Sequence, residues 1–365
     1  MPGAFEIVMD ERKALVDKII GMMKQGYFFN KEEWDRASLR PQNPLSKVQY
    51  KGGNRLRLMA MVIERGYTDP RWATARQYSE KGYFIKKGEH GILCEKWIFE
   101  KQKKVKDQDG NVSFETVQLE RPQVSFFRVF NAEQVQDFPS FSRNECPEPE
   151  VDTIIDRIID TSECPIHEIA QDRSFYSPST DEIYLPLRSQ FKDQTSFAKT
   201  LLHELSHMTG APARLNRKFG GPFGSESYAK EELRAEIGAL FTETDLGIPL
   251  SGEHYEDHSD YLKSWIGALK DDYNEFFHAC SDAEKICGRI VSNYTRKYEL
   301  TRVPDAVPEY APQLEKGIVS ENETSPEKKI VPESETNPER VATSDHGIET
   351  EKKPGTRPRR KEKTL

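Results

Sequence analysis

The sequence predicts an α+β protein with two folded domains followed by a long tail that lacks a core. At 365 residues the chain exceeds the usual size of a single core, and its 36% hydrophobic and 10% aromatic content is enough for globular domains. Segments with apolar residues at helical spacing are interspersed with shorter strand-like runs. A mean hydropathy of -0.76 is low for a protein that is compact throughout, so part of the chain is expected to be disordered.

The first domain is expected to span residues 1–140 and to combine helices with strands. An amphipathic helix ends near Gly26, and a loop rich in turn residues at 40–46 leads to a second, apolar helix. A charged loop that ends at Asn111 separates two groups of strands. The expected elements are helices at 6–24, 56–64 and 72–78, and strands at 82–85, 92–99, 114–119 and 124–130.

Residues 141–150 are expected to form a linker, because Ser, Asn, Glu and Pro dominate there, and residues 151–305 to form a second domain. Gly210 and Gly247 are well placed to end two of its helices. The expected elements are a helix at 151–159, a strand-turn-strand within 175–185, and helices at 196–208, 227–246, 261–269 and 276–294. Residues 311–365 contain no aromatic side chain and have balanced charges, which predicts a disordered, low-complexity tail.

Charge is distributed unevenly between the two domains. Residues 1–140 carry 24 basic and 19 acidic side chains, whereas residues 141–310 carry 18 basic and 31 acidic ones. Within the first domain, residues 41–106 carry 15 basic and 6 acidic side chains, interleaved with tyrosine and tryptophan. Cations next to aromatic rings are typical of proteins that bind single-stranded nucleic acid, although an ordinary core with a solvated basic face has the same composition.

A candidate metal site lies in the run from His203 to His207, with the sequence His-Glu-Leu-Ser-His. Two histidines four residues apart lie one above the other on a helix, so both can reach one metal ion. Glu204 projects from nearly the same side, where it can act as a base without occupying the metal. This is the arrangement of zinc peptidases, in which the metal lowers the pKa of a bound water.

The third metal ligand is expected on the helix at 227–246. Glu232 and Glu236 share one face of that helix, while Glu231 points about 100° away. We assign Glu232 as the ligand and Glu236 as the residue that holds a ligating histidine; a solvated acidic helix face is the alternative. Zinc is the expected ion, and another divalent metal is possible. Tyr228 is a candidate donor to the oxyanion.

The cysteine pattern indicates a reducing compartment. The five cysteines are scattered and odd in number, which indicates neither a disulfide framework nor a cysteine zinc site. The first residues lack the basic start and apolar run of a signal peptide, and nowhere are eighteen apolar residues consecutive. We therefore expect a cytoplasmic protein with no membrane partner.

Linked motifs along the chain resemble those of the antirestriction protein ArdC family of conjugative plasmids, over roughly residues 5–300. They include Tyr50-x-Gly-x-Asn54, Asp69-Pro-Arg-Trp72, Tyr176-x-Pro-x-x-Asp181, the His203 motif and Glu231-Glu-Leu-x-Ala-Glu236. The resemblance implies an N-terminal domain that binds single-stranded DNA and a C-terminal zincin-like metallopeptidase domain, which together shield incoming plasmid DNA from host restriction. Ser46-Lys47 departs from the Thr-Gly that is usual in the family.

Polar and aromatic signature residues in loops are better placed for phosphates and bases than for a core. On this basis, the residues expected to contact DNA are Asn43, Tyr50, Asn54, Arg71, Trp72, Gln77 and Lys87.

Three functions fit the sequence. The leading hypothesis is an antirestriction protein that binds single-stranded DNA and carries a zinc peptidase site with Glu204 as its base, acting on an unknown protein substrate or restriction enzyme. The second is a DNA-masking protein without catalysis, in which the metal is structural. The third is a protease that acts on proteins attached to DNA.

Overall fold

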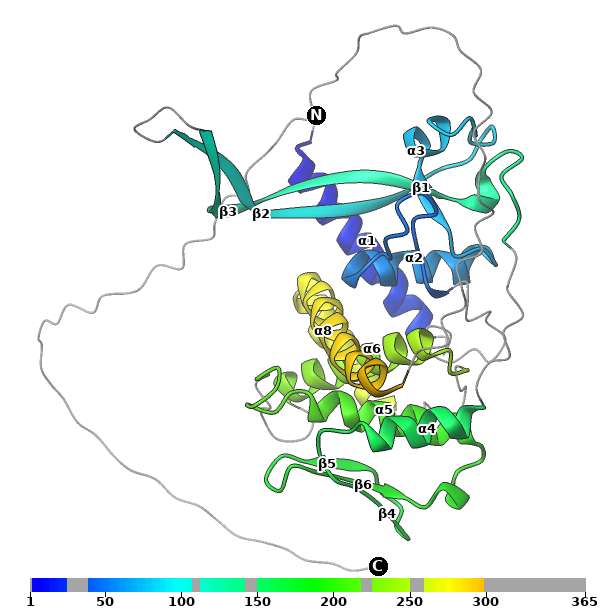
Figure 1. Cartoon of the computed structure of the whole chain (residues 1–365), viewed down its shortest axis with the longest axis vertical. Coiled ribbons are helices and arrows are strands. Elements are labelled where there is room, and N and C mark those ends of the chain that lie inside the picture. The colour runs from blue at the N-terminus through cyan, green and yellow to red at the C-terminus, as the bar shows by residue number, and fades with distance from the viewer. Residues whose placement is uncertain are drawn as a thin grey trace, which may run out of the picture. The chain divides into compact units, whose positions relative to one another are not determined.

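The computed structural model describes residues 2–24, 39–106, 112–141, 150–217, 225–249 and 259–298. Its mixture of helices and two separate sheets confirms the predicted α+β class (Figure 1). The predicted tail at 311–365 lies outside the described residues, as does 142–149 of the predicted linker. None of the described helices is both long enough and apolar enough to cross a lipid bilayer.

The first domain places helices α1 and α2 against a three-stranded antiparallel sheet of order β1-β3-β2. Gly66 ends α2 with a left-handed φ of 69°, which is the usual role of glycine after a helix. The elements are α1 (Ala4–Lys24), α2 (Gly52–Arg65), β1 (Trp72–Thr74), α3 (Ala75–Ser79), β2 (Ile92–Lys106), β3 (Val112–Asn131) and a 3-10 turn at Ala132–Gln134.

Four predicted elements of this domain were wrong in detail. Residues 72–78 divide into a strand and a short helix, because Thr74 caps α3 and pairs with Val129 as the last residue of β1. The predicted strand at 82–85 is reduced to a bridge between Ile85 and Val135. The predicted strands at 114–119 and 124–130 are one long strand, β3, and the lysines that predicted a loop belong to β2, because a two-stranded ribbon with both faces in water accommodates charge.

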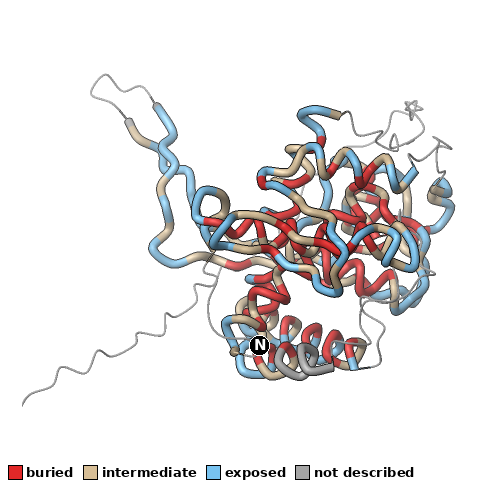
Figure 2. Tube along the Cα trace, turned by 90° about the horizontal axis from the view of Figure 1, so that it is seen from below, coloured by how far each residue is buried: buried red, intermediate tan, exposed pale blue. Residues whose placement is uncertain are grey.

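The β2–β3 ribbon bends where its register shifts. Ile98 lies opposite Gln123, but Glu100 lies opposite Gln118, so one residue of β2 faces four of β3. Such irregularities redirect a strand and release side chains from the regular pattern. We call residues 100–106 and 112–118 the outer ribbon; Figure 2 shows it as an exposed arm that extends away from the helices.

The second domain begins with α4 and a three-stranded sheet of order β4-β6-β5, in which β4 runs parallel and β5 antiparallel to β6. Strand β4 was not predicted, because it is only four residues long and mixes polar and apolar side chains. The elements are α4 (Val151–Asp160), β4 (Ile166–Ile169), β5 (Phe175–Ser177), β6 (Glu182–Pro186), a 3-10 turn at Arg188–Gln190, α5 (Gln194–Met208), α6 (Glu226–Leu246), α7 (Ser259–Asp271) and α8 (Tyr273–Lys297).

Helix α8 belongs to two hydrophobic cores. Phe276 and Phe277 pack with residues of α1, α2 and α6, whereas Ile286 and Ile290 pack with residues of α4, α5 and β6. The approach of α6 to α8 is so close that a Cβ on Gly238 would lie 2.9 Å from Ile286 Cγ2. The two domains that are distinct in sequence are therefore joined by a shared helix.

A buried cation also ties α2 to α6. Arg55 is 4% exposed and donates hydrogen bonds to the carbonyl oxygen of Phe241 and to Asp245 Oδ1, both at 3.0 Å. These acceptors lie at the C-terminal end of α6, where a positive charge is favoured by the helix dipole. Because the cation is desolvated, loss of its partners would leave a buried unpaired charge.

Candidate metal centre

Helix α5 presents the two histidines of the His-Glu-x-x-His run to α6. The helix begins at Asp193, whose side chain accepts a hydrogen bond from Ser196 N at 2.8 Å. Its apolar face, which includes Phe197 and Leu201, is fully buried in the core with α4 and β6. The half-buried His203 and His207 lie on another face, close to the first half of α6.

Three side chains converge with the spacing of metal ligands. The Nε2 atoms of His203 and His207 lie 3.1 Å apart, and they lie 3.4 Å and 3.5 Å from the two carboxylate oxygens of Glu232. Ligands at about 2.05 Å from a tetrahedral zinc ion are separated by about 3.3 Å. The donor set of two imidazoles and one carboxylate is also that of catalytic zinc sites, so these residues fit a divalent metal ion in both geometry and chemistry.

Each histidine has a carboxylate behind it. His203 Nδ1 lies 3.2 Å from Glu236 Oε1, an ion-pair distance, as expected for the residue assigned to hold it. His207 Nδ1 lies 3.3 Å from Glu231 Oε1, and this partner was missed in the sequence. Partners of this kind fix the orientation of a ligating imidazole and raise its basicity.

Arg217 holds Glu231 in place. Its guanidinium donates to Glu231 Oε1 at 2.8 Å and Oε2 at 3.1 Å, and also to the carbonyl oxygen of Ser206 at 2.6 Å. Both side chains are about one-tenth exposed, so this ion pair is largely desolvated. In the sequence, Glu231 is recognisable only as an acidic residue next to Glu232. Helical geometry directs it to a different side of α6 from Glu232.

Glu204 lies beside the candidate metal site under a strand of the sheet. It is 6% exposed, and its Oε2 accepts a hydrogen bond from Tyr176 N of β5 at 2.8 Å. The Tyr176 hydroxyl in turn donates to Asp181 Oδ1 at 2.8 Å, and Arg214 pairs with both oxygens of Asp181. The β5–β6 hairpin is thus anchored to the segment after α5 and fixes one oxygen of Glu204.

Burial and charge act in opposite directions on the ionisable groups of the site. Burial disfavours a charged imidazole, but the neighbouring Glu236 and Glu232 outweigh it and raise the pKa of His203 well above its usual value. The same balance raises the pKa of His207 to about 9. Burial raises the pKa of Glu204, whereas the pKa of Glu232 is lowered because the two imidazoles outweigh its burial. The site is therefore one that attracts positive charge.

Four of the seven residues predicted to contact DNA hold the first domain together. Trp72 is fully buried in the core, and Arg71 is a buried cation paired with Asp69. The Tyr50 hydroxyl donates to the Trp72 carbonyl oxygen at 2.9 Å. The Asn54 side chain exchanges two hydrogen bonds with the backbone of Glu95. These four residues of the sequence motifs either fill the core or bond to groups within the domain. The atoms that were expected to contact DNA are therefore already in use.

The loop at 41–50 is organised by two more of these residues. Asn43 Oδ1 accepts from Leu45 N and Ser46 N, and its amide donates to Gln77 Oε1 at 3.1 Å. Lys47 takes a left-handed φ of 60°, a conformation that glycine adopts more readily than lysine. Lys87, by contrast, is exposed and remains available for a phosphate.

Two family models match the chain in succession. The N-terminal domain of the anti-restriction factor ArdC matches residues 9–131, and a zincin-like metallopeptidase matches residues 153–282. An uncharacterized protein of Sinorhizobium fredii, y4eC, is 30% identical over 280 residues, which cover 76% of this chain and 90% of that protein. The chain belongs to the ArdC-like antirestriction family.

Solved structures and further relatives agree with this membership. The metal-free and Mn(II)-bound crystal structures of the antirestriction protein ArdC from the R388 plasmid are 26% identical, with TM-scores of 0.61 and 0.60; they cover 78% of this chain and 98% and 97% of those chains. Two Escherichia coli proteins named DNA primase TraC are 36% and 40% identical over 87% and 75% of this ArdC-like chain. The chain spans only 30% and 19% of their lengths.

Proposed function

We propose that this ArdC-like protein binds single-stranded DNA through its first domain and hydrolyses peptide bonds at a metal site in its second, and that it thereby protects incoming mobile-element DNA from restriction. The observation that carries the proposal is the near-tetrahedral spacing of His203, His207 and Glu232 next to the buried Glu204. Zinc is the proposed ion, because the ligands are two imidazoles and one carboxylate.

The protein's own groups supply orientation and proton transfer. A divalent ion held by the three ligands acts as a Lewis acid toward a water and a carbonyl oxygen. Glu204 Oε2 is fixed by Tyr176 N, so Oε1 is the oxygen that accepts the proton of the attacking water and returns it to the leaving amine. Its raised pKa brings it closer to neutrality, which suits a group that both accepts and donates a proton.

Tyr228 is the proposed donor to the developing oxyanion. It lies one turn before Glu232 on the same side of α6, and its backbone N–H is held by the helix cap Ser225. Strand β5 lies at one edge of its sheet and beside α5, and because its Tyr176 N–H is bound to Glu204, a substrate peptide would pair with the other backbone groups of this edge.

The case for DNA binding rests on charge and exposure. The excess of basic residues at 41–106 continues into the outer ribbon, where Lys101, Lys103 and Lys104 are exposed. Two relatives are named DNA primases, and the module that they share with this chain is only part of their length. We expect affinity for single strands to fall steeply with salt, because phosphate contacts release counterions; a flat response would remove this part of the proposal.

The test of catalysis is the variant Glu204→Gln, which keeps the metal ligands and removes the base. A matched control is Glu226→Gln, since this exposed glutamate lies at the start of α6 and pairs with Lys230 on the same helix. We expect Glu204→Gln to lose protection against restriction with its metal content unchanged, while Glu226→Gln behaves as wild type. Equal protection by both variants would favour the DNA-masking function with a structural metal.

Metal analysis of the purified protein tests the site itself. Glu232→Ala should lose the bound ion, whereas Glu226→Ala on the same helix should retain it. If Glu204→Gln abolishes protection, digestion assays on free proteins and on proteins crosslinked to DNA would then separate a general peptidase from a protease of DNA-attached proteins.

A further inference from the structure

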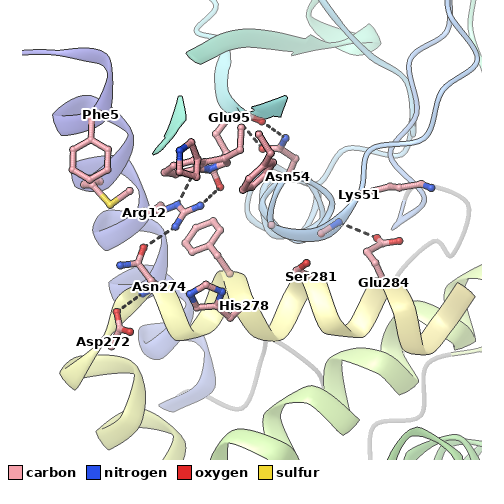
Figure 3. A pocket seen from close by; sticks show the side chains of 17 residues that line it. Phe5, Arg12, Lys51, Asn54, Glu95, Asp272, Asn274, His278, Ser281 and Glu284 are labelled. Atoms are coloured by element: carbon pink, nitrogen blue, oxygen red, sulfur yellow. Dashed lines mark hydrogen bonds and ion pairs between the residues drawn. The ribbon is translucent and has the colours of Figure 1, made fainter. Parts of the chain in front are cut away.

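A cavity of about 660 Å³ lies beneath the bend of the β2–β3 ribbon. Its walls come from both domains: α1, the start of α2 and the two strands on one side, and α8 on the other (Figure 3). The metal site contributes none of the lining residues, so the cavity has no role in the proposed hydrolysis.

The ribbon side of the cavity is aromatic. Phe99 has no partner across the ribbon, because Ile98 and Glu100 on either side of it pair with Gln123 and Gln118. Released from the pairing, Phe99 lines the cavity while remaining 56% exposed. Trp97 lies beside it, and its Nε1–H is buried without a hydrogen-bond partner among the described residues.

The α8 side of the cavity is polar. Asn274, His278 and Ser281 follow one another at intervals of four and three residues, which puts them on a single face of the helix. Arg12 spans the two sides: it donates to Asn274 Oδ1 at 2.7 Å and to both oxygens of Glu95. The arginine is therefore held rigidly, and the polar face of α8 stays open toward the cavity.

Exposed lysines stand at the rim of the cavity, whereas the charged groups inside it are paired with one another or with the backbone. Lys51 is exposed at one edge, and Lys101 is exposed on β2 just beyond Phe99. Inside, Arg12 is paired with both oxygens of Glu95, and Glu284 accepts a hydrogen bond from Gly52 N, so the interior arginine is not available to a phosphate. A polynucleotide would thus keep its backbone on the lysines and direct an uncharged group inward.

We propose that this cavity takes one unpaired base of a single-stranded DNA, with the base against Trp97 and Phe99 and its polar edge toward α8. The inference rests on the proposed binding of single-stranded DNA and deepens it by naming where a base is held. A planar ring with hydrogen-bonding edges matches a cavity with one aromatic and one polar side, and bases in a duplex are not free to enter it.

The test compares two phenylalanines of the same ribbon. Phe99 lines the cavity, and Phe114 is similarly exposed, at 67%, but lies on the outer ribbon opposite Lys104 and away from the cavity. Binding of a labelled single strand of about 15 nucleotides is measured by fluorescence anisotropy. Phe99→Ala should weaken binding by about fivefold or more, the loss expected when one base loses its aromatic partner, and Phe114→Ala by clearly less.

A second variant probes the opposite wall. His278 is exposed on α8, so His278→Ala should leave the fold intact, yet it should weaken binding of the same strand although it lies in the second domain. Unchanged binding in both Phe99→Ala and His278→Ala would overturn the cavity as the base site. So would a loss of binding in Phe114→Ala as large as that in Phe99→Ala. A wild-type protein that binds no single strand would instead overturn the proposed function.

Discussion

Replacement of Glu231 by glutamine tests whether the partner of His207 sets the affinity of the metal site. Glu231 is 7% exposed, its Oε1 lies 3.3 Å from His207 Nδ1, and Arg217 fixes it from the other side. Glutamine keeps the shape of the side chain and removes the charge that raises the basicity of the imidazole. Losing such a partner weakens metal binding by about ten- to hundredfold, or about 1.4 to 2.7 kcal/mol.

The Glu231→Gln substitution should also lower the stability of the metal-free protein. Arg217 keeps its hydrogen bonds to the carbonyl oxygen of Ser206 and to Thr209 Oγ1, but its buried charge loses the carboxylate. We expect the free energy of unfolding of the metal-free protein to fall by about 1 to 3 kcal/mol. Competition with a chromophoric chelator measures the first effect for zinc and manganese, and denaturant unfolding after metal removal measures the second.

A control variant separates the two effects. Arg217→Met breaks the ion pair but leaves the Glu231 carboxylate facing His207, so it should lower stability while metal affinity stays near that of wild type. If Glu231→Gln binds metal as tightly as wild type, the carboxylate does not tune His207 and the reasoning is wrong. If Arg217→Met loses as much affinity as Glu231→Gln, the effect comes from general loosening of the site.

Three further predictions concern pH, the hairpin and the domain boundary. The pKa of His207 in the metal-free protein, about 9, lies above its ordinary 6.5, so the stability contributed by the charged imidazole is present below pH 6.5 and lost as pH rises through 9. Metal affinity should rise over the same pH window, because a metal binds the neutral imidazole. Chelator titrations at several pH values measure the affinity, and unfolding of the metal-free protein measures the stability. An affinity that falls, or a stability that rises, between pH 6.5 and 9 would contradict the prediction. Asp181→Asn suits the left-handed φ of 55° but loses the charge that pairs with Arg214, so protection against restriction should fall while metal content measured on the same protein stays constant. A fragment of residues 1–141 lacks α8 and should be unfolded by circular dichroism, whereas residues 1–298 should fold; a cooperative unfolding transition of the short fragment would contradict the shared core.

The grouping of the three candidate metal ligands could be predicted because it depends on local geometry. His203 and His207 are four residues apart on one helix, and Glu232 and Glu236 are four residues apart on another, so the sequence places each pair on one face. Glu231 was missed because its role depends on how two helices face each other. The 100° turn that separates it from Glu232 brings it to the far side of the second imidazole, which no spacing within α6 reveals.

The residues of the first domain were harder to assign, since a polar side chain in a loop can face either water or the backbone. Asn54 pairs with the backbone of Glu95, and Trp72 fills the core, although both were expected at the surface. The sequence predicts a break between two strands at residues 120–123, whereas the structure has one continuous strand there. Residues 119–122 form the longer side of the ribbon irregularity. Strand β3 continues through them because it pairs with β2 on both sides, and the local sequence does not reveal this pairing.

Helix α8 also determines when the protein becomes complete during its synthesis. Phe276 and Phe277 close the core around α1 and α2, and Ile290 closes the one around α5, so neither core is finished until the ribosome has passed that helix. Contacts between α1 and α8 are among the most distant in sequence that the described residues make, and such contacts form late and slowly. A nascent chain therefore completes its first and second domains in the same step, and a chain that stops before α8 completes neither.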